Sequence, residues 1–163
     1  MKIRLIAVVL SLSALFISFL THAQQRPIGF FVTSVGVGDG GNLGGFKGAD
    51  AHCQKLAAAA GAGNRQWRAY LSGNADPENP RKRGQFARAR IGSGPWYNAR
   101  GVLIATNVDD LHLYNKTISR ETALDENGNY IKGRYDKPNE HDILTGAPED
   151  GTAFFGFDGK DYS

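Results

Sequence analysis

The feature that most restricts how this chain can fold is a stretch of helical periodicity between residues 48 and 62. Small and apolar side chains recur there every three or four residues, which is the spacing of one buried helix face. These residues are Ala49, Cys53, Leu56, Ala57 and Ala60. We expect Asp50 in the first turn, where the helix dipole favours a carboxylate, and Gly61 and Gly63 just past the helix end. The small side chains predict close packing against a neighbour.

The ten residues 36–45 hold six glycines, which is too many for a stable helix or strand. They therefore predict a loop that leads into the helix. A phosphate-binding role is the alternative interpretation of such a run. However, the run lacks the Lys-Ser/Thr ending of a P-loop and does not match the dinucleotide-binding fingerprint. A structural loop is the favoured reading.

Short strands are expected on both sides of the helix. Stretches rich in β-branched and aromatic residues, or alternating apolar and polar residues, predict strands at 28–34, 66–72 and 101–107. Within 124–131, Asn127-Gly128 predicts a hairpin. We also expect a short helix in the basic run 81–90 and a core position for Trp96. One clear helix, few short strands and long loops indicate the α+β class.

The first residues of the chain predict export. Lys2 and Arg4 precede the apolar stretch 5–20, and Thr21-His22-Ala23 has the small residues that signal peptidase reads. A membrane anchor is the alternative, but a span needs ~20 apolar residues. We therefore expect residues 1–23 to be a signal peptide that is removed. The mature part, residues 24–163, is expected to form one domain that is secreted or periplasmic, with no membrane contact after signal removal.

The charge of the chain argues against a nucleic-acid partner. The formal net charge of +3 includes two basic residues of the signal peptide, so the mature part is nearly neutral. The most basic stretch comprises Arg81, Lys82, Arg83, Arg88 and Arg90. It could attract a polyanionic glycan, but acidic neighbours at Asp76 and Glu78 favour an ordinary solvated surface.

Two polar clusters are candidate ligand-binding sites. They consist of Asp109, Asp110 and His112, and of Asn139, His141 and Asp142. Neither cluster alone has the six or more oxygens of a hard-cation site or the ligand set of zinc. We therefore expect no metal and no cofactor. The alternative explanation for both clusters is that their side chains hydrogen-bond to the backbone of their own turns. A binding site is favoured instead if the two clusters meet in space.

We expect no enzymatic activity. His141 beside Asp142 could orient a general base, and an exported hydrolase is therefore an alternative. No G-x-S-x-G motif supplies a nucleophile, and Cys53 lies on an apolar stripe, where a thiol is inert. Cys53 is also the only cysteine. An odd cysteine in an exported protein suggests intermolecular pairing or a missing partner.

Several motifs resemble the N-terminal half of the endostatin-like branch of the C-type lectin fold, as found in bacterial secreted lectin-like proteins. The more specific pair is Gly48-Ala49-Asp50-Ala51-His52-Cys53 followed by Arg68-Ala69-Tyr70-Leu71-Ser72. The other motifs are Phe31–Ser34, Gly41–Gly45, Ala60-Gly61, Arg90-Ile91-Gly92, Gly94-Pro95-Trp96, Asn98-Ala99 and Asn139–Gly146. The resemblance covers roughly residues 29–152.

The resemblance implies a non-enzymatic domain that binds a cell-surface glycan or an extracellular protein. In the family, the cysteine that matches Cys53 is bonded to a later cysteine, and the last strand lies beside the first. This sequence has Phe154–Asp158 where relatives continue, so we expect a domain incomplete at its C-terminus. A degenerate product without activity is then a further alternative. Calcium-dependent sugar binding is not expected, because its ligands lie mainly in the later half.

Overall fold

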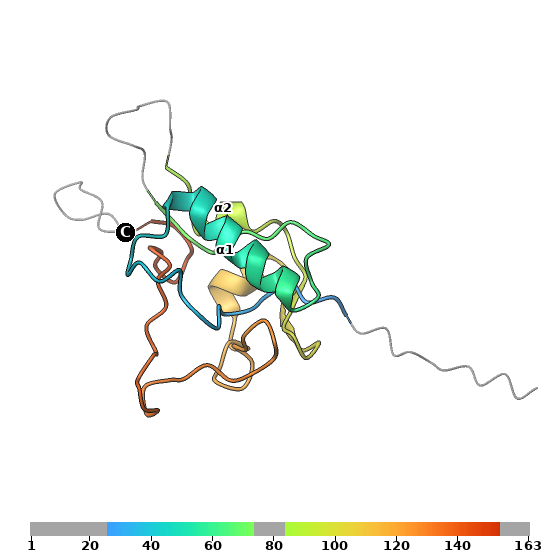
Figure 1. Cartoon of the computed structure of the whole chain (residues 1–163). Coiled ribbons are helices and arrows are strands. Elements are labelled where there is room, and N and C mark those ends of the chain that lie inside the picture. Colours follow the sequence, from blue (N-terminus) through green and yellow to red (C-terminus); the bar gives the residue numbers. More distant parts are fainter. Residues whose placement is uncertain (1–25, 74–83, 154–163) are drawn as a thin grey trace, which may run out of the picture.

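A computed structural model describes residues 26–73 and 84–153 of the chain (Figure 1). The expected signal peptide, the basic residues Arg81-Lys82-Arg83 and the segment Phe154–Asp158 lie outside these described residues. The described part contains helix α1 (Gly45–Ala59), helix α2 (Ala87–Arg90), strand β1 (Trp96–Tyr97), strand β2 (Leu103–Ala105) and the π-helical turn η1 (Asp110–Tyr114). None of its helices is long and apolar enough to cross a membrane.

Helix α1 begins earlier than its periodicity predicts. Gly48, expected at the start of the helix, lies three residues inside it, where a Cβ atom would come 2.1 Å from the Leu43 carbonyl oxygen. Because glycine has no Cβ, the incoming loop can pass directly over the helix at this point. The expectation that Asp50 occupies the first turn is therefore wrong, since that turn contains no acidic residue.

The end of α1 confirms the predicted glycine stop. Gly61 has a positive φ of 80°, which is a conformation that favours glycine. The Gly61 N–H donates to the Ala58 carbonyl, and the Ala62 N–H donates to the Ala57 carbonyl. These two bonds form a Schellman motif, which satisfies carbonyls that the last helical turn leaves unpaired. On the predicted buried face, Ala49 and Ala57 are buried, whereas Cys53, Leu56 and Ala60 are half-buried.

The predicted strands 28–34 and 66–72 are extended segments rather than regular strands. The first makes one parallel bridge, between Val32 and Asp125, and the second leads into an antiparallel bridge between Gly73 and Gln85. In the second segment, backbone N–H groups donate to helix side chains instead of a neighbouring strand. Apolar and polar residues still alternate there, because Trp67 is buried and its two neighbours are exposed.

The predicted strand at 101–107 is present in shortened form as β2. It pairs with β1 in an antiparallel register that sets Trp96 opposite Ala105 and Tyr97 opposite Leu103. The hairpin prediction is also confirmed, with an antiparallel bridge between Leu124 and Tyr130.

A small core forms around the β1–β2 pair. Trp96, Ile104 and Ala105 are buried in it, as expected for the tryptophan. Four partly buried residues pack against this cluster, namely Phe30, Ile91, Val108 and Leu111. The described residues thus combine helices with a two-stranded sheet, and the C-type-lectin-like α+β architecture stays a prediction.

Candidate functional site

The described residues form an open groove of about 1520 Å³. Its walls come from the extended segments 29–37 and 65–70, from α1 and η1, and from the loop 142–149. Exposed apolar side chains contribute to these walls, among them Leu113, Ile143 and Leu144. The groove is therefore lined by both apolar and polar groups from segments far apart in the sequence.

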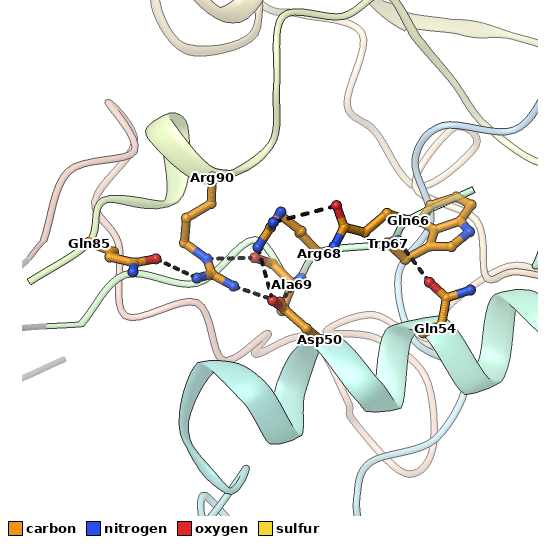
Figure 2. A network of polar contacts seen from close by, with 8 residues as sticks. All are labelled: Asp50, Gln54, Gln66, Trp67, Arg68, Ala69, Gln85 and Arg90. Carbon is orange, nitrogen blue, oxygen red and sulfur yellow. Dashed lines mark hydrogen bonds and ion pairs between the residues drawn. The ribbon is translucent and has the colours of Figure 1, made fainter.

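One wall of the groove is held by a salt bridge between α1 and α2 (Figure 2). Arg90 Nη2 lies 2.6 Å from Asp50 Oδ1, and the Arg90 side chain is only 5% exposed. Asp50 Oδ1 also accepts the N–H of Ala69 at 2.8 Å. Gln85 accepts a bond from the other end of the guanidinium, which lies 4.2 Å from the centre of the Phe46 ring. This arrangement ties α1, α2 and segment 65–70 together.

Arg90 contradicts the interpretation of its basic stretch as a solvated surface. The guanidinium is buried because Asp50, 40 positions earlier, supplies the compensating charge. Arg88, two residues before it, follows the expectation better, since it pairs with the exposed carboxylate of Asp109 at 3.3 Å. Neither cation is therefore available as an unpaired charge for a polyanion.

His112 and Tyr70 form a second polar contact in the groove wall. His112 Nδ1 lies 2.6 Å from the Val108 carbonyl oxygen, and its Nε2 lies 2.9 Å from the Tyr70 hydroxyl. A carbonyl can only accept, so Nδ1 carries a proton, and Nε2 accepts from Tyr70 in the neutral tautomer. Burial, followed by the negative charge of Asp150, raises the pKa of Tyr70. The hydroxyl therefore stays protonated and keeps this donor role.

The other residues of the first predicted cluster serve local structure. The Asp110 carboxylate accepts the backbone N–H and the hydroxyl of Thr106. These hydrogen bonds lower the pKa of Asp110. The Asn107 side chain caps the Asp110 N–H, and Asp109 pairs with Arg88. Side chains that hydrogen-bond their own turn, the alternative given above, account for Asp110.

The second predicted cluster lies on an exposed loop. His141 Nδ1 lies 2.7 Å from Asn139 Oδ1, and its Nε2 lies 3.3 Å from Asp142 Oδ1. Both ring nitrogens of His141 thus face side-chain oxygens of the same loop. No contact joins this cluster to the first among the described residues, but His112 and Asp142 both line the groove. The two clusters therefore share the groove through these two members but do not contact each other.

A metal site finds no support in the described ranges. There, no three side chains of the histidine, cysteine, aspartate or glutamate type gather closely enough to hold an ion. The buried carboxylates of Asp125 and Glu126 are satisfied by hydrogen bonds instead. Asp125 accepts from Asn127 and Asn129, and Glu126 accepts the Ser34 N–H and hydroxyl.

The thiol of Cys53 is a free, half-buried group on α1. Burial, with the nearby Asp50 carboxylate, raises the pKa of Cys53 from 9.0 to about 11. A thiolate is the reactive form, so we predict that iodoacetamide alkylates native Cys53 at pH 8 roughly 100-fold more slowly than the unfolded chain. The native pKa is the higher one, so folding stability should also fall as the pH rises from 9 to 11. Equal alkylation rates in native and urea-unfolded protein would contradict this prediction.

Sequence reasoning missed three residues that shape the groove. Arg90 and Asp50 were not connected, and Tyr70 was assigned only to a strand face. Asp50 itself could have indicated the salt bridge from the sequence, because it lies beside the small, apolar face of the helix. A carboxylate that is withdrawn from water there needs a cation or several hydrogen-bond donors. The sequence pattern does not reveal which of the many arginines supplies the cation.

No family model, no curated protein and no solved structure matches this chain. The resemblance to the C-type-lectin/endostatin-like family therefore stays a prediction from the motifs. A function must be argued from the groove and the chemistry of its walls.

Proposed function

We propose that this chain is an exported, non-enzymatic binding domain with a C-type-lectin/endostatin-like architecture, which holds a glycan or an extracellular protein in the groove. The observation that carries this proposal is the size of the groove. Its volume of about 1520 Å³ exceeds the ~300–1000 Å³ that is typical of small-molecule pockets. A segment of a macromolecule suits such a space better than a small metabolite does.

The chemistry of the described residues supports binding rather than catalysis. The Cys53 thiol is protonated at neutral pH, because its pKa is about 11. His112 uses both ring nitrogens to hold Tyr70 and the Val108 carbonyl. A catalytic base needs a ring nitrogen directed at a nucleophile or at substrate, and His112 has none to spare.

The contact between His141 and Asp142 is the one observation that favours the hydrolase alternative. In a triad, the carboxylate orients one ring nitrogen and leaves the other for the nucleophile. Here Asn139 accepts from Nδ1 and the exposed Asp142 carboxylate lies 3.3 Å from Nε2, and no serine or cysteine of the described residues hydrogen-bonds to either nitrogen. A hydrolase would require turnover that disappears in His141→Ala.

The binding proposal predicts that a charge placed on an apolar position of the groove weakens binding. We expect Leu144→Arg to weaken saturable binding at least ~10-fold, because an unpaired cation would replace an apolar contact. Leu144 is 57% exposed, so the free energy of unfolding should change by less than about 0.5 kcal/mol. Binding is measured on a glycan array and an array of extracellular proteins, with protein purified after export.

Val102→Arg is the matched control for this experiment. Val102 is also an exposed apolar residue, at 44%, but it does not line the groove. Equal losses for the two variants would place the binding site elsewhere. No saturable binding by the unmodified protein, together with rapid proteolysis, would instead support the degenerate product.

A further inference from the structure

From Phe30 to Ser34, the backbone N–H groups of the first extended segment use only one of its two edges for hydrogen bonding. Just before this stretch, the Gly29 N–H shares the Tyr97 carbonyl with Phe30. The N–H groups of Phe30 and Val32 donate to the carbonyls of Tyr97 and Leu124. Two residues further on, on the same side of the chain, the Ser34 N–H donates to the Glu126 carboxylate. Successive peptide groups of an extended chain point in opposite directions, so these three bonds define a single, paired edge.

Among the described residues, the opposite edge is unpaired at Phe31 and Thr33, and it belongs to the groove. Within the described residues, the N–H groups of Phe31 and Thr33 donate no hydrogen bond, and their carbonyls accept none. Both residues line the groove and are half-buried. An unpaired strand edge is a template for another strand, and unpaired backbone groups that are partly withdrawn from water are unfavourable.

The second extended segment in the groove wall shows the same alternation. The N–H groups of Trp67 and Ala69 donate to side chains of α1. The N–H groups of Arg68 and Tyr70, which alternate with these along the chain, donate to no described residue. The groove is thus lined by two extended segments, each with unpaired N–H groups at two alternate residues among the described ones, Phe31 and Thr33 in the first and Arg68 and Tyr70 in the second.

Positive and negative side chains are balanced in the groove wall, where Arg65, Arg68, Arg90 and Lys132 accompany Asp125, Glu140, Asp142 and Glu149. Arg68 and Arg90 both face Asp50, and Lys132 faces Glu140 at 3.3 Å. This leaves little net charge to attract an acidic or sulfated glycan. The charge of the groove instead complements an uncharged, partly apolar segment.

We propose that the ligand of the groove is an extended segment of an extracellular polypeptide, which adds as a strand to the free edge at Phe31 and Thr33. This inference rests on the proposed binding function and names its ligand class. A polypeptide strand offers an N–H and a carbonyl at every second residue, which is the repeat of the free groups. Its alternate side chains can contact exposed apolar residues of the groove, such as Ile143 and Leu144.

The test uses random linear decapeptides displayed on phage and selected on protein purified after export. A selected peptide is then synthesised with N-methyl groups on alternate residues, in both possible registers. Each N-methyl group removes one backbone donor without altering the protein. Because two lost hydrogen bonds weaken binding by ~10-fold, we expect that loss in one register and a much smaller loss in the other. Amide exchange at Phe31 and Thr33 should slow when the unmodified peptide binds.

Three results would overturn the inference, and they differ in what they say about the binding function. Equal loss in both registers, or unchanged exchange at Phe31 and Thr33, would exclude strand addition while leaving peptide binding intact. Saturable binding on the glycan array without any selected peptide would assign the groove to a glycan. Failure of both arrays and of the peptide library would remove the binding function as well.

Discussion

Replacing Arg90 by methionine is expected to lower the free energy of unfolding by about 3 kcal/mol, as breaking a buried ion pair does. Methionine preserves most of the side-chain length but supplies no positive charge. Asp50 would then keep only the Ala69 N–H and the distant Arg68, whose Nη1 lies 3.5 Å from Asp50 Oδ2. The Gln85 side chain and the Phe46 ring would lose their cationic partner at the same time. Urea unfolding of the purified protein measures the change.

Arg88→Met is the matched control, because Arg88 lies on the same short helix. Its partner Asp109 has a side chain that is 74% exposed, and pairs of this kind contribute ~0–1 kcal/mol. We therefore expect Arg88→Met to change stability by less than about 1 kcal/mol. Similar losses for the two variants would mean that the Arg90–Asp50 pair has no special role in holding α1 and α2 together.

Local sequence patterns predict the parts of this fold that local interactions determine. Helix α1, its glycine stop and the turn at Asn127-Gly128 follow from residues within a few positions of one another. The start of α1 was misplaced because it depends on the close approach of Leu43 to Gly48. The pattern of apolar residues carries no trace of that contact.

Strand prediction failed at 28–34 and 66–72 for a different reason. The β-branched and aromatic residues of Phe31-Val32-Thr33 suit an extended backbone, and the backbone is extended there. A regular strand also needs a partner along its length, whereas Val32 makes only one bridge. Ala69 pairs with a helix side chain instead. Composition thus predicts local conformation but does not predict pairing.

The candidate site was predictable only in part, because its contacts link distant residues. His112 and Asp142 were named from sequence and do line the groove. Tyr70, which holds His112, is 42 positions away from it, and no motif connects the two. Asp110, by contrast, interacts with Thr106 only four positions earlier, as a turn-forming role requires.

Gly151→Ala is expected to destabilise the protein by about 3 kcal/mol or more. An alanine Cβ would lie 2.3 Å from His112 Nε2 and 2.9 Å from the Cβ of Arg88. Gly151 also has a φ of 73°, a conformation that costs other residues about 1–2 kcal/mol. Relieving the overlap must displace the His112 ring and with it the bond to Tyr70, adding about 1–3 kcal/mol of overpacking strain. Urea unfolding again measures the loss.

Gly101→Ala separates the backbone cost from the packing cost. Gly101 has nearly the same φ, 75°, but a Cβ atom there would meet no atom within 4 Å. Only the conformational penalty of about 1–2 kcal/mol should then appear. In a His112→Ala background, most of the steric overlap at Gly151 is gone, so the cost of Gly151→Ala should fall toward that of Gly101→Ala. An unchanged cost in that background would show that His112 does not press against Gly151, and its position in the groove wall would need another explanation.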